Sequence, residues 1–349
     1  MTIQHDMTLS VGGSRYRGFT RGEVRLSMDQ AAPTFECEYV DSKRTGGALW
    51  TIDEGDACVV SIDGEPVVYG HAEDVETGYS ATHRSARAAG RGKLGDIVDS
   101  SILGRYQFRG KTLADVATIL TKPFGIRVRF DGSPGAPFRR FRCQPGDKVF
   151  EVLARAARLR GFVPIEVAGE LVFTRAGSRR VRTVLRRGEN VVSSTRSGTH
   201  RNRYSEYHFR GQTQASDELS GKSATELSGE VTDPQIKRHR PLLVTASGSE
   251  GNRDLGKAAV LERNRRAGES ERVSCVVEGW RDDDGALWEQ NTLVPVEDDW
   301  VRVHGTLIVV DVAYTFGPNE PYLTRLELTR PEAYDEIGYP TRGRGGVWN

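Results

Sequence analysis

The chain has 349 residues, of which 37% are hydrophobic and 28% charged, and its formal net charge is +1. This length suffices for two or three domains with ordinary cores, and the balanced charge gives no overall attraction to nucleic acid or to a membrane surface. The longest apolar run, residues 307–310, is far too short to span a bilayer, and residues 1–10 lack the pattern of a secretion signal.

Residues 1–100 are predicted to form a first β-barrel domain. Polar and apolar side chains alternate over residues 24–28 and 35–39, which is the pattern of half-buried strands. Asp63-Gly64 is typical of a hairpin turn between two valine-rich strands, and residues 75–79 and 81–89 suggest a further pair. Strands of this number and spacing predict a small barrel or sandwich.

Residues 101–177 change period and predict an α+β insert domain. A helix is expected after Thr112, which with Asp115 resembles a start cap, and its apolar face consists of Leu113, Val116, Ala117 and Leu120. A second helix is expected over residues 148–160, with Asp147 as its N-cap. The other expected elements are strands, at residues 124–130, 163–167 and 171–174.

Residues 178–335 are predicted to form a second β-barrel domain. Within it, residues 211–230 are polar and without apolar period, which predicts an exposed loop. Residues 254–266 predict a helix, and strands return from residue 271 to about residue 329. Residues 336–349 hold Pro and Gly with little pattern and are expected to form a C-terminal extension.

A short pattern occurs twice at an offset of 238 residues. Cys37 precedes Gly-Ala-Leu-Trp at residues 47–50, and Cys275 precedes the same four residues at 285–288. The segments after each Trp are also alike: residues 57–62, 66–69 and 72–75 in the first copy, and residues 300–303, 307–310 and 311–314 in the second. Two copies of one β unit indicate internal pseudo-symmetry, which is typical of a ring or shell component.

The four cysteines are Cys37, Cys58, Cys143 and Cys275. None lies in a C-x-x-C pair, and no Cys/His cluster has the spacing of a zinc site. Three of them lie in strand-like apolar contexts, where a buried free thiol is the usual state. We therefore expect a reducing compartment and no metal.

Several short motifs suggest chemistry but fit a structural role better. Gly221-Lys222-Ser223 lacks the first glycine of a phosphate loop and lies in the polar segment. The acidic run at residues 282–284 lacks the alternating ligands of a calcium loop and predicts a hairpin tip. His200 and His208 lie near Tyr204 and Tyr207 without a cysteine or acidic partner at ligand spacing.

Asp53, Glu54 and Asp56 could supply an acid and a base for glycoside cleavage. They lie in one polar connection after Trp50, whereas such a pair should converge from separate elements. A charged loop is the favoured interpretation, and we predict no catalytic, cofactor-binding or metal-binding residues.

Charge is unevenly distributed along the chain. Residues 139–210 hold 17 Lys/Arg and 6 Asp/Glu (+11), and residues 271–336 hold 5 Arg and 15 Asp/Glu (−10). The basic stretch, which includes Arg186, Arg187 and nearby aromatic residues, could bind nucleic acid, form a solvated face, or pair with the acidic stretch of a neighbouring subunit. The last interpretation is favoured, because head-to-tail contacts in a cyclic ring bring different surfaces together.

Local matches that carry a family resemblance succeed one another along the chain. They comprise residues 113–117, 123–126, 144–155, 161–162, 169–173, 233–236, 240–241, 277–288 and 324–328. Together they span roughly residues 20–335, and in them the chain resembles the baseplate hub proteins of contractile phage tails, the Mu-type hub protein and its late-control protein D relatives.

The resemblance implies two similar β-barrels per subunit, smaller α+β parts, and a homotrimeric torus with pseudo-sixfold inner symmetry. It implies an adaptor between the sixfold tail tube and the threefold spike, around a channel that DNA crosses at ejection. The implied partners are the tail tube or tube-initiator protein, the central spike and other baseplate (wedge) proteins, with no membrane anchor. The implied location is the virion baseplate, after assembly in the host cytoplasm.

The sequence leaves three hypotheses. The first is the structural hub just described, which has no enzymatic activity. The second is a tail-associated peptidoglycan-degrading enzyme that uses Asp53, Glu54 or Asp56. The third is a nucleic-acid-binding module that uses the arginine-rich middle of the chain.

Overall fold

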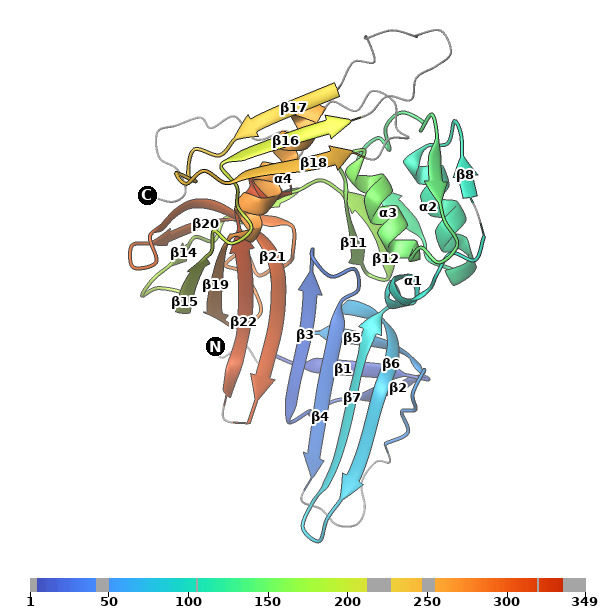
Figure 1. Cartoon of the computed structure of the whole chain (residues 1–349). Coiled ribbons are helices and arrows are strands. Elements are labelled where there is room, and N and C mark those ends of the chain that lie inside the picture. Colours follow the sequence, from blue (N-terminus) through green and yellow to red (C-terminus); the bar gives the residue numbers. More distant parts are fainter. Residues whose placement is uncertain are drawn as a thin grey trace, which may run out of the picture.

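The computed structural model describes residues 5–41, 50–104, 106–211, 227–246, 255–318 and 320–334. Within these ranges, strands of both predicted β regions belong to one fourteen-stranded sheet. Figure 1 shows the blue and cyan strands running edge to edge into the red ones, with the green insert to the right and yellow strands above. The predicted fold class, mainly β with an α+β part, is confirmed.

The first β unit pairs its strands in the order β3-β4-β7-β6-β5-β1-β2. Alternation drives this arrangement: Cys58, Val60 and Ile62 of one strand point to the core and are almost fully buried. Its strands are β1 (Met7–Val11), β2 (Ser14–Tyr16), β3 (Arg21–Ser27), β4 (Thr34–Asp41), β5 (Ala57–Ile62), β6 (Glu65–Tyr79) and β7 (Arg84–Gly92).

The α+β insert has its own core, in which helices pack against small sheets. Its elements are α1 (Gly95–Asp99), β8 (Tyr106–Phe108), α2 (Leu113–Thr121), η1 (Lys122–Phe124), β9 (Val128–Phe130), β10 (Phe141–Cys143), α3 (Val149–Arg158), β11 (Val163–Val167) and β12 (Glu170–Thr174). The strand predicted over residues 124–130 is therefore shorter, because a 3₁₀ turn occupies its start.

The two predicted helix caps in the insert have different outcomes. Thr112 and Asp115 form the expected capping box at the start of α2. Asp147 does not cap α3: Lys148 is the N-cap residue, and its side chain makes no cap hydrogen bond. The Asp147 carboxylate instead accepts a hydrogen bond from the Gln144 amide at 2.9 Å, and the first helical amide, that of Val149, donates to the Ser100 carbonyl.

The second β unit repeats the pairing of the first, in the order β15-β19-β22-β21-β20. Its elements are β13 (Arg179–Arg180), β14 (Leu185–Arg186), β15 (Val191–Gly198), β19 (Glu271–Glu278), β20 (Thr292–Asp298), β21 (Val303–Gly317), β22 (Glu320–Thr329) and η2 (Pro331–Ala333). Two short parallel strands, β13 and β14, extend its edge at β20.

A small α+β layer lies between β15 and β19 in the sequence. It consists of β16 (Glu206–Gly211), β17 (Leu227–Thr232), β18 (Pro241–Ala246) and α4 (Leu255–Glu269). Tyr207 and Phe209 alternate inward from β16 and pack against Leu255 and Ala259 of α4. Figure 1 shows α4 between these yellow strands and the red second unit.

This layer corrects the loop predicted over residues 211–230. Gly211 pairs with Leu227 and Arg210 with Ser228, so both ends of the segment are strands of one hairpin. Residues 212–226, including Gly221-Lys222-Ser223, lie outside the described residues, as do the predicted extension at 336–349 and the first-copy residues 47–49.

The internal duplication is confirmed by strand register. Cys37 in β4 lies opposite Ala88 in β7, and Cys275 in β19 lies opposite Leu326 in β22. Both residue numbers of the second pair exceed those of the first by 238 (275 − 37 and 326 − 88). Both long hairpin strands also carry a register shift at an equivalent place, between Ala72 and Asp74 in β6 and between Val309 and Asp311 in β21. A bulge is a local feature that an unrelated sheet would not place at the same register.

The register also corrects two details of the predicted alignment of the copies. Residues 57–62 form β5, and their counterpart is β20. Residues 300–303 instead comprise part of the turn before β21 and the first residue of that strand. Asp74-Val75 corresponds to Asp311-Val312, because each dipeptide comes directly after its bulge and faces equivalent residues of β7 and β22. The offset between the copies is 238 at Cys37 and Cys275 (275 − 37 = 238) but 237 at Asp74 and Asp311 (311 − 74 = 237), so one fixed offset cannot align them throughout.

The two units share one hydrophobic core. Its buried members come from both units and include Leu9, Val60, Val277 and Leu326, each at most 3% exposed. The sequence predicts two similar barrels but not how they meet; in the structure β3 of the first pairs with β21 of the second.

Candidate functional site

The joint between the two β units is the antiparallel pair β3–β21, from Gly22 opposite Phe316 to Ser27 opposite Asp311. The Arg25 Nε donates to both carboxylate oxygens of Asp311, at 2.9 and 2.8 Å. The Asp311 side chain is 9% exposed, so Arg25 is the partner that offsets the burial of this carboxylate. The ion pair adds a side-chain contact to the backbone pairing of the joint.

Gly22 allows an aromatic ring to close the joint. A Cβ at Gly22 would lie 2.5 Å from Phe316 Cε1 and 2.7 Å from Met7 Sδ, so any larger residue would displace the ring. Phe316 packs in turn against Trp280 and Tyr322, with ring centroids 5.9 and 5.6 Å away. The joint is thus packed as a core.

Glu166 fastens the insert to the first β unit. Its carboxylate, on β11, accepts hydrogen bonds from the backbone amides of Lys93 at 3.2 Å and Leu94 at 2.9 Å. The residue is 4% exposed, and burial raises the pKa of its carboxyl to about 7, against the lowering effect of the two amides. This group titrates near neutral pH because its site is dry.

Asn291 performs the matching role for the second unit. It is 2% exposed and adopts a positive φ of 62°. Its side-chain oxygen accepts from the Gly177 amide at 2.7 Å, and its amide nitrogen donates to the Arg175 carbonyl at 2.9 Å. The segment that leaves the insert is therefore held against the turn before β20.

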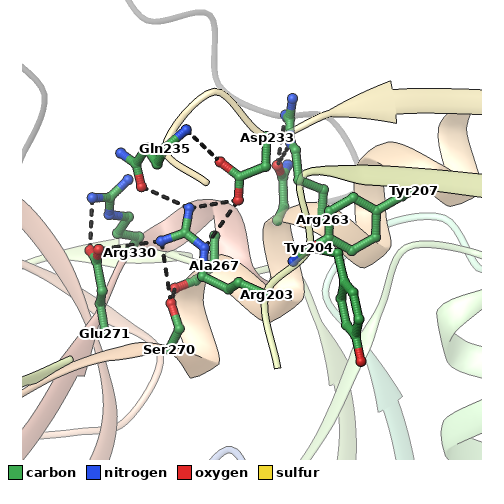
Figure 2. A network of polar contacts seen from close by, with 11 residues as sticks. Arg203, Tyr204, Tyr207, Asp233, Gln235, Arg263, Ala267, Ser270, Glu271 and Arg330 are labelled. Carbon is green, nitrogen blue, oxygen red and sulfur yellow. Dashed lines mark hydrogen bonds and ion pairs between the residues drawn. The ribbon is translucent and has the colours of Figure 1, made fainter. Parts of the chain in front are cut away.

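A buried polar network surrounds Arg203, whose side chain is 2% exposed (Figure 2). Its Nε and Nη2 donate to Asp233 Oδ2 at 3.0 and 2.7 Å, and Nη2 also donates to Gln235 Oε1 at 2.7 Å. Its Nη1 lies 3.5 Å from Glu271 Oε1, and Glu271 also pairs with Arg330 at 2.7 Å. The network joins the small α+β layer to the start of β19 in the second unit.

The predicted enzymatic candidates form a tight turn, not a cleft. The Asp56 carboxylate accepts a hydrogen bond from the Asp53 amide at 2.9 Å, and Asp53 and Glu54 are exposed. The acidic run at 282–284 forms a turn, in which Asp282 accepts from the amides of Asp284 and Ala286. Among the described residues, no group of His, Cys, Asp and Glu could hold a metal ion.

His208 has acidic partners that the sequence interpretation missed. Its Nε2 lies 3.0 Å from Glu206 and its Nδ1 3.1 Å from Glu230, and these carboxylates raise the pKa of the imidazole. Glu206 lies two residues away on the same strand, so the two side chains share a face. The two-residue spacing of Glu206 and His208 in the sequence could have indicated this pair.

The basic and acidic stretches do meet, but within one chain. Arg186 Nε lies 2.7 Å from Glu297, and Arg179 lies 3.6 Å from Glu289. Arg187 lies over the Trp300 ring, 5.5 Å from its centroid. Parallel pairing of β14 with β20 thus gives Arg186 an acidic partner in its own chain, and pairing of the two stretches across subunits stays a prediction.

Sequence reasoning missed the main polar contacts at the joints. Glu166, Arg203 and Asn291 have partners more than two dozen residues away, which no local pattern predicts. All four cysteines are buried and free, whereas the sequence predicted this for three of them. No helix in the described ranges is long and apolar enough to cross a membrane.

Three family profiles match the chain in succession. They are described as "Mu phage baseplate assembly protein GpP-like, N-terminal" (residues 6–92), "Baseplate hub protein gp44-like, second domain" (residues 94–175) and "Mu phage baseplate assembly protein GpP, fourth domain" (residues 255–336). The chain is also similar to the baseplate hub protein gp44 of Escherichia phage Mu, with 28% identity over 342 residues that cover 95% of this chain and 89% of that protein.

Two crystal structures share the fold. The 43 kDa tail protein of prophage MuSo2 from Shewanella oneidensis has a TM-score of 0.82 and 30% identity, over 95% of this chain and 99% of that one. The tail protein from Neisseria meningitidis MC58 has a TM-score of 0.80 and 23% identity, over 94% and 99% of the two chains.

Proposed function

Because this chain belongs to the family of baseplate hub proteins of Mu-like phages, we propose that it forms the homotrimeric hub ring of a contractile tail. In this role it adapts the sixfold tail tube to the threefold central spike. Its partners are the tube or tube-initiator protein, the spike and the surrounding baseplate proteins, and it acts in the virion baseplate after assembly in the host cytoplasm.

The observation that carries the proposal is the duplication inside one sheet. Two β units with matching register, joined edge to edge through β3 and β21, mean that three chains supply six similar units. Such a ring presents six near-equivalent surfaces to a sixfold tube while keeping threefold symmetry for a spike. A trimer with one β unit per chain would offer only three such surfaces.

The central opening of this ring is the route that DNA takes at ejection, and DNA is a passing cargo. The formal net charge of +1 gives little attraction that would hold it in the channel. The chain works by assembly, without catalysis, because Asp53, Glu54 and Asp56 share one surface turn.

The test is the mass and shape of the purified protein. Light scattering should give three times the chain mass of 38.6 kDa, and negative-stain images should show a ring with a central hole and six similar lobes. A monomer at all accessible concentrations, or a ring of another number, contradicts the proposal. Clearing of a peptidoglycan suspension that Asp56→Asn abolishes would favour the enzyme instead.

A further inference from the structure

Strand β3 of the first unit and strand β15 of the second occupy equivalent places but have different neighbours. Gly22 of β3 lies opposite Cys37 of β4, and Ser194 of β15 lies opposite Cys275 of β19, the equivalent cysteine of the second copy. Residues of β3 therefore correspond to residues of β15 at an offset of 172, since 194 − 22 = 172. The far edge of β3 pairs with β21, whereas β15 ends the sheet among the described residues.

The long hairpin strands differ in the same way. The residues of β21 after its bulge pair with β3 on one side and β22 on the other. The corresponding residues of β6, from Asp74 to Tyr79, pair with β7, and β5 covers only the earlier part of the strand, up to His71. In the described part of the chain, no other strand covers this end of β6.

Burial reflects these missing partners. Asp311, Val312, Ala313 and Tyr314 of β21 are all buried, but of their counterparts in β6 only Val75 is partly covered. Most residues of β15 are exposed as well. Apart from Val191, which makes an isolated bridge with Arg187, the outer edge of β15 has no strand partner among the described residues. An open edge is a liability in a protein that stays single and is usually blunted by Pro or charged side chains; β15 holds no Pro and one charged residue, Arg196.

We propose that β15 of one subunit pairs antiparallel with the end of β6 in the next subunit, which repeats between chains the β3–β21 joint inside each chain. This inference rests on the proposed ring and names its contact. Carrying over the internal register places Thr199 opposite Asp74, Ser197 opposite Glu76, and Ser194 opposite Tyr79. Small hydroxyl side chains then face acidic ones, which can accept their hydrogen bonds.

The aromatic residue at the end of each joint supports the equivalence. Phe316 of β21 corresponds to Tyr79 of β6; the first packs against the core over Gly22, whereas the second is 92% exposed. In the carried-over register, Tyr79 covers Ser194 and lies next to Val192, a residue at the bulged start of β15 that is 58% exposed. Two exposed apolar side chains thereby bury each other.

The contact uses a different surface on each partner, so each subunit offers one β15 edge and one β6 edge. Head-to-tail contacts of this kind close into rings when the rotation allows it. Strand addition at an open edge is a common mode of protein recognition, in which the backbone supplies affinity and side chains fix the register. Here the sheet continues from chain to chain.

Disulfide trapping tests the register directly. Residues opposite each other in an antiparallel pair have Cβ atoms roughly 4.5–5.5 Å apart, close to what a disulfide requires. The double variant Glu76→Cys/Ser197→Cys should oxidise to a covalent trimer on a non-reducing gel. The control Glu76→Cys/Ser193→Cys, four residues out of register and so roughly 13 Å away, should stay monomeric on the same gel.

The results of the cross-linking distinguish a failure of the proposed strand contact from a failure of the proposed ring. If the wild-type protein is a trimer and the in-register pair cross-links no better than the control, the strand contact is wrong and the ring stands. If the wild-type protein is a monomer throughout, both are wrong. A cross-linked trimer from the in-register pair alone supports both.

A second measurement uses Tyr79. The variant Tyr79→Asp should raise the concentration at which the trimer half-dissociates by roughly tenfold or more, as expected when a buried aromatic contact is replaced by a charge. Leu103→Asp is the matched control, since Leu103 is 94% exposed but lies in the insert, and it should leave assembly unchanged. Equal assembly of both variants and the wild type would overturn the inference.

Discussion

The Glu166 carboxylate accepts a hydrogen bond from the Leu94 amide at 2.9 Å, across 72 residues of sequence. One residue thus joins the insert to the end of the first β unit, at the point where β7 passes into α1. Gly92 has no side chain there because a Cβ would lie 2.4 Å from the same carboxylate. The joint is therefore both polar and sterically tight.

Glu166 makes stability fall as pH rises toward neutrality. Burial raises its folded-state pKa to about 7, above the unfolded value of about 4.3, so the folded state binds more protons between these values. Stability from this group is complete below the unfolded pKa and is lost as pH rises through the folded pKa, by roughly 4 kcal/mol in total. Urea unfolding of Glu166→Gln should lack this decline.

The readout for Glu166 is a difference between two proteins. The unfolding free energy of the variant minus that of the wild type should increase by about 3 kcal/mol from pH 4.5 to 7.5. Glu54→Gln removes a carboxylate from an exposed turn and controls for general charge effects. A pH-independent difference for Glu166→Gln would mean that the carboxyl is not held protonated.

The four cysteines should be unreactive in the folded protein. Burial raises the pKa of the Cys37 and Cys58 thiols to about 12 and of the Cys143 and Cys275 thiols to about 11. At pH 8 the thiolate is therefore scarce, and the sulfur is shielded from reagent. A thiol-disulfide reagent should label none of them quickly under native conditions and all four in denaturant; fast native labelling of any one contradicts this packing.

Sequence patterns predicted those parts of the fold that depend on local order. Alternation located the strands around Cys37 and Cys275, and the spacing of Thr112 and Asp115 located a helix start. The hairpin β16–β17 was missed because its strands are polar, although Tyr207 and Phe209 alternate inward and could have revealed it. Asp147 failed as a cap because a tight turn with Gln144 uses its carboxylate.

The joints could not be predicted, for a different reason. Arg203 has the same local context as the surface arginines around it, and only the path of the chain brings Asp233 and Glu271 to it. The pairing of β3 with β21 links residues almost 300 positions apart, such as Arg25 and Asp311. Such contacts depend on the arrangement of whole units, which one sequence does not encode locally.

Removing one charge of the Arg203–Asp233 pair should destabilise the folded protein more than replacing both residues by apolar ones. Both charges of the Arg203–Asp233 pair are buried, with side chains 2% and 4% exposed. Asp233→Ala leaves the buried Arg203 with only its longer contact to Glu271 as a carboxylate partner and should destabilise by roughly 3 kcal/mol. The double variant Arg203→Met/Asp233→Leu should cost less than Asp233→Ala alone. Chemical denaturation checks both, with Arg265→Met as a partly exposed arginine control; a double variant worse than the single would refute the account.

Gly22→Ala should destabilise the joint between the two β units. The added Cβ would overlap the Phe316 ring and the Met7 sulfur, at 2.5 and 2.7 Å, and relief requires both side chains to shift within a packed core. Overpacking of this kind costs about 1–3 kcal/mol, which thermal and urea unfolding can resolve. Gly104→Ala is the matched control, because its Cβ would meet its nearest neighbour, Tyr106, at an ordinary 3.5 Å. If both variants unfold like the wild type, Phe316 does not close the joint as tightly as the contacts indicate.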